Sequence, residues 1–352
     1  MPTYKPSSSN IYLGVAFVLG LSGPLAVLAL DHYYWHLSIF RENWPNFTVG
    51  HLFRSAVIIL SACLLCWSTW QLSARRNGKS FTQERWSAFE RGSILACLLM
   101  SLALLVLFLV RPSVFSNLSL EDHPVEWASA GCLFAASALF ATAFFNASAD
   151  RQWTLPVRWT LVLFSVLFLL IGLEEISWFQ RVFEFRTPDL FFKNAQREIN
   201  LHNFATDKTE NAYYFGAFVF LVVLPFIRSQ RLLPSTNHYF ELLVPRTYLL
   251  GAGTIACAYN FDMWNTVFTQ VEFFGALAIL LTYALICAQG FERVVAAGAA
   301  VLSAVTQVVF LSRGEWFARE YEVKEYKELL IPLGFALFAL DVYRRVNKPN
   351  PR

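Results

Sequence analysis

Two adjacent carboxylates, Glu174 and Glu175, stand at the end of a long apolar run, and the polar stretch that follows contains Glu198 and His202. Carboxylate and imidazole groups are common general acids and bases in enzymes, and they also ligate metals. We therefore interpret these four residues as candidate catalytic groups, acting as acid and base around a bound substrate or as ligands of a divalent metal. The competing interpretation is a solvated segment whose polar face meets only water.

Nearby polar and aromatic residues could bind the substrate of such a site: Glu126, Trp178, Arg181, Asn200 and Asn203. Adjacent carboxylates repel each other, so a cation is expected beside them. In a continuing helix Arg181 shares a face with Glu174 and could be that cation. Further on, the four-residue spacing of Asn194, Glu198 and His202 predicts a short helix with all three on one face.

The composition indicates which elements must position these groups. Of the 352 residues, 56% are hydrophobic and 15% are charged, whereas roughly 25% are charged in ordinary globular proteins. A helix needs roughly 20 apolar residues to cross a bilayer. Ten runs of that kind occur, near 11–30, 52–72, 92–110, 126–146, 159–178, 211–227, 242–260, 268–289, 294–312 and 329–345. The sequence predicts an all-α, polytopic transmembrane bundle of about ten spans, forming a single integral membrane domain over residues 1–352.

The loops between these runs differ in charge. Lys and Arg concentrate in every second loop, and Asp and Glu in the others. Because cytoplasmic loops are enriched in Lys and Arg, this pattern predicts cytoplasmic termini in a bacterial inner membrane, with the candidate site facing the periplasm or exterior. Residues 179–210 combine aromatic groups that avoid water with polar groups that cannot face lipid, so we expect an outer re-entrant or interfacial segment there.

Two further motifs have a chemical and a structural interpretation. His32 and His36 are four residues apart and could ligate zinc if the first helix continues past them, or they could belong to an interfacial Tyr/Trp belt. Cys63 and Cys66 form a CxxC pattern inside an apolar run, where buried hydrophobic roles are expected.

No nucleotide-binding fingerprint occurs, and the basic loops follow from orientation, so nucleic acid is not an expected partner. The sequence does not define an oligomeric state.

The stretch 312–329 is also rich in charge. Lys324 is four residues from both Glu320 and Glu328, a spacing that stabilises exposed helices. We interpret this stretch as a solvated helix leading into the last span. The alternative is a wall of the site made from Glu315 and Arg319.

The run LEEISWFQR followed by NAQREINLHN, from Leu173 to Asn203, resembles a pattern in a family of bacterial polytopic membrane proteins, and residues 121–127 extend the likeness. The resemblance implies a membrane-embedded helical fold and no particular activity. Membrane hydrolases related to alkaline ceramidase combine a helix bundle with a His-ligated zinc, but this chain lacks their paired histidines near the last span.

Three functions fit these features. The first is an enzyme acting on a lipid or lipid-linked substrate at the outer face, with membrane lipid as its surroundings. The second is a transporter or channel for a polar small molecule, and the third is a non-catalytic membrane subunit of an envelope assembly. Ion-coupled transporters keep charged groups at mid-depth in their spans, and the apolar runs here carry almost none, which favours the first and third functions.

Overall fold

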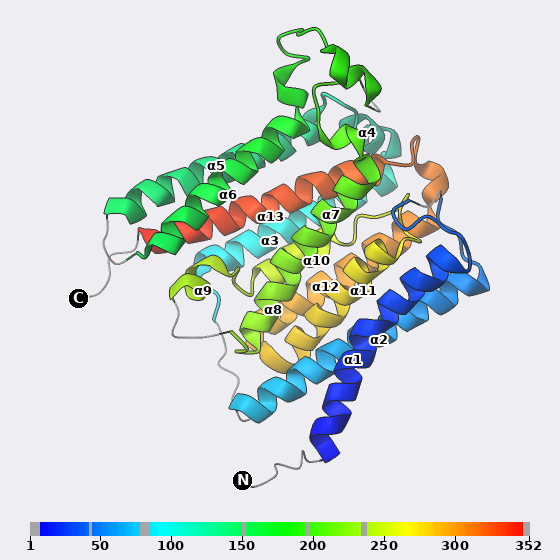
Figure 1. Ribbon diagram of the computed structural model, residues 1–352, viewed down its shortest axis with the longest axis vertical. Coiled ribbons are helices and arrows are strands. Elements are labelled where there is room, and N and C mark those ends of the chain that lie inside the picture. Colours follow the sequence, from blue (N-terminus) through cyan, green and yellow to red (C-terminus); the bar gives the residue numbers. More distant parts are fainter. Residues whose placement is uncertain are drawn as a thin grey trace.

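The computed structural model describes residues 8–41, 44–77, 85–149, 153–194, 197–233 and 238–347, and every regular element in these ranges is a helix (Figure 1). Both ends of the chain lie outside the described residues. So do several of the basic residues on which the predicted orientation depends: Lys5, Lys79, Arg151, Lys348 and Arg352.

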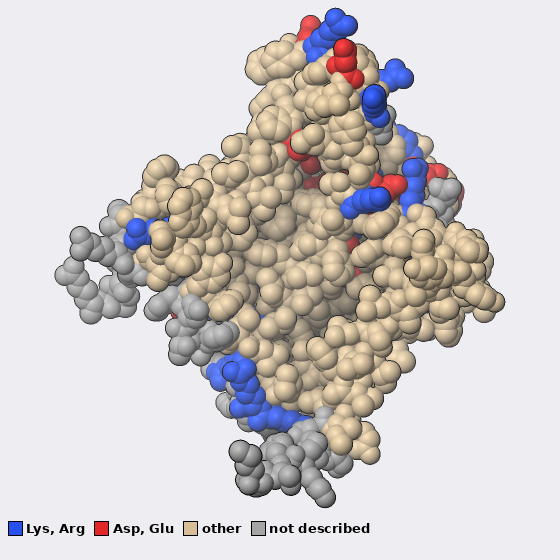
Figure 2. Space-filling view, viewed as in Figure 1, with Lys and Arg blue, Asp and Glu red and all other residues tan. Residues whose placement is uncertain are grey.

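Within the described ranges, eight helical segments are long and apolar enough to cross a membrane. They are α1 (Ser8–Tyr33), α2 (Val49–Asn77), α3 (Ala88–Val110), α5 (Pro124–Ala149), α6 (Leu155–Glu175), α7 (Thr206–Phe218) continued through a π-helical turn into α8 (Leu224–Ser229), α11 (Val267–Thr282) continued to Cys287, and α12 (Gly290–Ser312). In Figure 2 a broad zone with almost no charged side chains separates charged groups near the ends of the molecule. The protein is therefore an integral membrane protein with several transmembrane helices.

Two predicted spans are not among these eight segments. The run 242–260 is broken near Pro245 into α9 (His238–Leu243) and α10 (Leu249–Ala256). All eight residues of α10 are buried, so this short helix packs inside the protein. The last run belongs to α13 (Glu322–Val346), which has 25 residues but carries charged groups near both ends. The count of about ten spans therefore stays a prediction.

α13 packs along α5, and α5 packs along α6, so these three helices lie side by side (Figure 1). The start of α13 is held by aromatic packing against the short helix α4 (Pro112–Leu118): the rings of Tyr326 and Phe115 stack with centroids 4.0 Å apart. The Tyr326 hydroxyl also donates to the Phe115 carbonyl at 2.7 Å. This packing places the first turns of α13 at the end of the bundle where α6 stops.

Candidate functional site

A cavity of about 860 Å³ opens at the end of the bundle where α6 ends and α7 and α13 begin. Seven of the residues singled out from the sequence line it: Glu126, Glu175, Arg181, Glu198, Asn200, His202 and Asn203. Glu174 and Trp178 are not among its lining residues. These residues therefore share one cavity, and their catalytic and binding roles stay predictions.

α6 ends in a tight left-handed turn. Ser177, Trp178 and Phe179 have φ angles of 46°, 56° and 59°, in a region that L-residues seldom occupy. The helix expected to carry Arg181 on the same face as Glu174 therefore stops before it reaches Arg181. The turn instead sends the chain back across the end of the bundle, towards residues 197–203.

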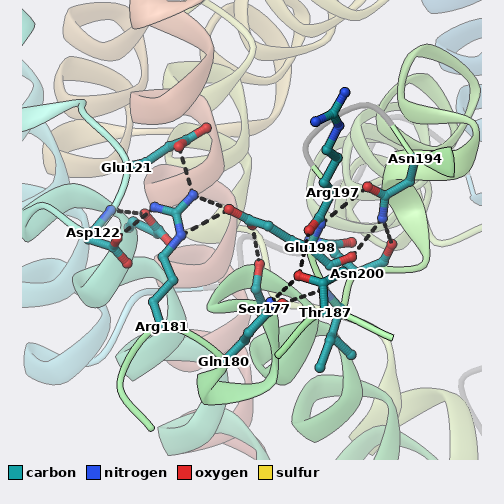
Figure 3. Close-up of polar contacts among 12 residues, drawn as sticks. Glu121, Asp122, Ser177, Gln180, Arg181, Thr187, Asn194, Arg197, Glu198 and Asn200 are labelled. Carbon is teal, nitrogen blue, oxygen red and sulfur yellow. Dashed lines mark hydrogen bonds and ion pairs between the residues drawn. The ribbon is translucent and has the colours of Figure 1, made fainter. Parts of the chain in front are cut away.

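Arg181 is the centre of an ion-pair network at the rim of the cavity (Figure 3). Its Nε donates to Glu198 at 2.9 Å, its Nη1 to Asp122 at 2.6 Å and its Nη2 to Glu121 at 2.8 Å. Ser177 Oγ donates to the other oxygen of Glu198 at 2.6 Å. Burial alone would lower the pKa of Arg181, but its bonds to the three carboxylates raise it overall. The network fixes Glu198 as a paired, hydrogen-bonded carboxylate.

The helix predicted from the spacing of Asn194, Glu198 and His202 does not form. A 3₁₀ turn ends at Lys193, and the Asn194 side chain then closes a loop (Figure 3). Asn194 Nδ2 donates to the backbone carbonyls of Glu198 at 2.7 Å and Asn200 at 3.1 Å, and its Oδ1 accepts from the Glu198 N–H at 3.2 Å. Asparagine commonly bonds to nearby backbone in this way, in competition with helix formation.

Glu174 holds this loop to the end of α6. Its carboxylate accepts hydrogen bonds from Trp178 Nε1 at 2.8 Å, from the Leu201 N–H at 2.7 Å and from the His202 N–H at 3.2 Å. Its backbone carbonyl accepts from Asn200 Nδ2 at 2.8 Å. These contacts give Glu174 a positioning role, because its acceptor capacity is used by groups of the protein itself.

His202 is half-buried beside this carboxylate, with Nδ1 3.8 Å from Glu174 Oε2. Burial lowers the pKa of His202, and the carboxylates of Glu210 and Glu174 only partly oppose this shift. The shift favours the neutral imidazole, and His202 lines the cavity as a group able to accept or donate a proton.

The opposite wall was not identified from the sequence. It comes from α7, the loop before α11 and the first turns of α13, and its charged residues are Asp207, Lys208, Glu210, Asp262, Lys324, Glu325 and Glu328. Lys324 Nζ bonds both carboxylate oxygens of Glu210, at 2.9 and 3.0 Å, and Tyr214 donates to Glu328. The interpretation of Lys324 as an exposed helix-stabilising partner of Glu320 and Glu328 was therefore wrong.

The alternative wall of Glu315 and Arg319 is also not formed. Glu315 is exposed and does not line the cavity. Arg319 bonds the Ser116 carbonyl at 2.7 Å and lies 3.5 Å from Glu322. One feature of the sequence could have indicated the second wall of the cavity. Glu325 and Glu328 stand directly before the last apolar run, where full solvation is hard to maintain.

The cavity is strongly acidic. Ten Asp or Glu side chains line it against four Lys or Arg, and acidic side chains are visible at depth in Figure 2. Burial raises the pKa of Asp262, and the nearby charge of Lys324 partly opposes this.

Among the described residues, no three His, Cys, Asp or Glu groups are arranged to hold a metal ion. His32 and His36 do not share a helix face, because α1 ends at Tyr33.

Together the fold and the cavity define a polytopic membrane protein with an acidic chamber at one end of its helix bundle. Comparisons with protein-family models, with curated proteins and with solved structures find no match. The function is therefore inferred below from the site alone.

Proposed function

We propose that this protein is a membrane enzyme that takes the polar head of a lipid or lipid-linked substrate into the acidic cavity and transfers protons to and from it. The observation that supports the proposal is the presence, in one chamber, of carboxylates in two different environments. Glu198 is paired with Arg181 and bonded to Ser177. Glu175 and Glu325 line the same chamber and form no ion pair within the described residues.

Two such environments suit acid–base chemistry. A carboxylate held beside a guanidinium stays ionised, whereas carboxylates crowded together away from cations retain protons more readily. Glu198 is then the fixed anion that binds or orients the substrate. Glu175 and the neutral imidazole of His202 are the groups available to donate and accept protons.

The charge of the chamber also selects the head group. Of the four cations that line the chamber, Arg181 is bound by three carboxylates and Lys324 by Glu210, so neither is available to an anionic ligand. The other two, Arg41 and Lys208, are exposed to solvent, which screens their charge. Introducing a phosphate or carboxylate would add repulsion to an existing excess of negative charge. We therefore assign a cationic, amine-bearing head group to the substrate.

We further propose that the cavity faces the periplasm or exterior of a bacterial inner membrane, in a bundle of about ten spans with cytoplasmic termini. In that orientation a lipid could enter from the outer leaflet. Residues 176–194 and 197–205 project beyond α5 and α6 (Figure 1) and expose large apolar groups, among them Phe183 at 63% and Phe185 at 54%. Such groups suit the membrane interface.

Head-group selection can be tested with three amphiphiles that share one chain: dodecylamine, dodecanol and dodecanoate. Each would be added at low mole fraction to the purified protein in nanodiscs, with thermal unfolding as the readout. We expect dodecylamine to raise the unfolding midpoint most, and Glu175→Gln with Glu325→Gln to remove that preference. Glu315→Gln is the matched control, because it removes an exposed glutamate outside the cavity. Equal effects of the amine and the carboxylate would refute the assignment.

Catalysis needs a separate measurement. The purified protein would be incubated with a total bacterial lipid extract, and the lipids compared by mass spectrometry with those treated with Glu175→Gln or Glu198→Gln protein. The proposal predicts that a lipid species is converted by the unaltered protein and is left unchanged by both variants. Binding of dodecylamine without conversion of any lipid would contradict an enzymatic role while leaving the cationic site in place.

A transporter for a cationic solute is the second candidate, because two ion pairs link separate elements at the other end of the bundle. There Arg246 pairs with Glu90 at 2.7 Å, and Arg91 pairs with Glu292 at 3.1 Å. A carrier open on one side requires a closed opposite end. Uptake of a radiolabelled polyamine into proteoliposomes, lost in Glu175→Gln and unaccompanied by lipid conversion, would favour this function over the enzyme.

A further inference from the structure

A second site lies far from the acidic cavity, where α1 and α2 separate. The two helices touch closely at Gly20, where an added side-chain carbon would lie 2.7 Å from Leu65 Cγ, and approach even more closely at Gly23. At Gly14, towards the start of α1, no atom lies within 4 Å of such a carbon. Figure 1 shows the start of α1 diverging from the end of α2.

The splayed ends enclose a groove of about 620 Å³. It is lined by Leu13, Gly14, Phe17, Ser68, Thr69, Leu72, Arg75 and Arg76. Its walls are apolar, with Phe17 and Leu72 exposed at 42% and 48%. The two arginines stand together at one end, in the last turn of α2. The groove thus has an apolar length and a cationic end.

We propose that this groove binds one anionic phospholipid, with its phosphate on Arg75 and Arg76 and an acyl chain between α1 and α2. Guanidinium groups match phosphate oxygens in charge and in hydrogen-bond geometry. The last turn of a transmembrane helix lies at the depth of the lipid head groups, and the sequence places this end on the cytoplasmic side, where anionic lipids attract basic residues. Arginines at a helix end also suit the helix dipole, but the dipole does not account for an adjoining apolar groove.

A free phosphate does not fit these observations equally well, because it would leave the apolar walls without an occupant. The two parts of the groove can be altered separately. Gly14→Leu fills the apolar part, and the open space at Gly14 accepts the side chain without a clash. Arg76→Gln, alone or with Arg75→Gln, removes charge from the other end and leaves the walls intact.

Native mass spectrometry of the full chain, released from detergent with added lipid, measures the binding. Phosphatidylglycerol is compared with phosphatidylcholine carrying the same acyl chains. We expect phosphatidylglycerol to bind more tightly, and each arginine removed to weaken it about fivefold. Gly14→Leu should abolish the bound lipid while the unfolding midpoint stays unchanged.

The matched controls are Gly298→Leu, at another exposed glycine with open space around it, and Arg186→Gln, at an exposed arginine elsewhere. Both should bind phosphatidylglycerol as the unaltered chain does. Equal binding of the two lipids, or full binding by Gly14→Leu and by the double arginine variant, would overturn the proposal. Displacement of the lipid by glycerol phosphate alone would also overturn it, since the site would then be one for a free anion.

Discussion

The adjacent glutamates Glu174 and Glu175 are expected to respond in opposite ways to mutation. Glu174→Ala removes the acceptor of three hydrogen bonds, from Trp178, Leu201 and His202. Glu175→Gln keeps the shape of the side chain and removes a titratable carboxyl that has no ion-pair partner in the described structure. The first change should loosen the loop over the cavity, and the second should leave the fold intact.

The size of the effect follows from the contacts. A hydrogen bond to a charged group contributes about 1.5–3 kcal/mol. Two of the three bonds share one oxygen of Glu174, and Leu201 is exposed, so water replaces part of what is lost. Counting two bonds at the lower value, we expect Glu174→Ala to lower the free energy of unfolding by about 3 kcal/mol. Glu175→Gln should change it by no more than about 0.5 kcal/mol.

Thermal unfolding in detergent, together with limited proteolysis of residues 176–205, measures both effects. Glu174→Ala should unfold at lower temperature and be cut faster in this segment, whereas Glu175→Gln should match the unaltered protein in both assays and lose only the amine preference. If Glu174→Ala were as stable as the unaltered protein, the positioning role of Glu174 would be wrong. Equal destabilisation by both changes would mean that the two glutamates do not differ in role.

Three further predictions concern other parts of the molecule. Lys327 and Glu272 form a buried pair at 2.6 Å, so Lys327→Met should lower the unfolding free energy by about 3–5 kcal/mol, and adding Glu272→Gln should restore most of it in thermal unfolding. Because the pKa of Asp262 is raised by burial, the folded state binds more protons there than the unfolded state. Stability from this group is present below its ordinary pKa and is lost as pH rises through the raised value, so Asp262→Asn should flatten a plot of unfolding midpoint against pH in that window. Reporter fusions at residue 352 and within 182–208 should report opposite compartments, and one shared compartment would contradict the ten-span topology.

Hydropathy was sufficient to predict an all-helical membrane protein, because long apolar runs have few alternatives to a membrane-spanning helix. It did not anticipate that 242–260 divides into two short helices, of which α10 is wholly buried. A buried core helix and a lipid-facing helix have the same composition, and only packing separates them. It was also ambiguous for α13, whose charged ends are paired: Lys324 with Glu210 on α7, and Arg345 with Asp341 one turn away on α13 itself.

Local spacing predicted the site less well than composition predicted the fold. The periodicity of Asn194, Glu198 and His202 suggested a helix, but the Asn194 side chain found backbone partners that satisfy it better in a loop. Arg181 was expected beside Glu174 and instead pairs with Glu198 and with the loop before α5. In both cases a contact within the folded chain overrode the helical pattern, as is common where polar groups gather at the end of a helix.

The missed wall shows why a spacing of four residues cannot by itself separate an exposed helix from a functional one. Lys324 has carboxylates four residues away on both sides, the pattern of a solvated helix surface. In the structure its ammonium turns to Glu210 on α7, while Tyr326, about 200° further around the helix, packs against Phe115. The first turns of α13 therefore have packed neighbours on both of these faces and are not a solvated surface. A charged helix start that alternates with large aromatics, directly before a transmembrane run, is better interpreted as one wall of a buried polar chamber.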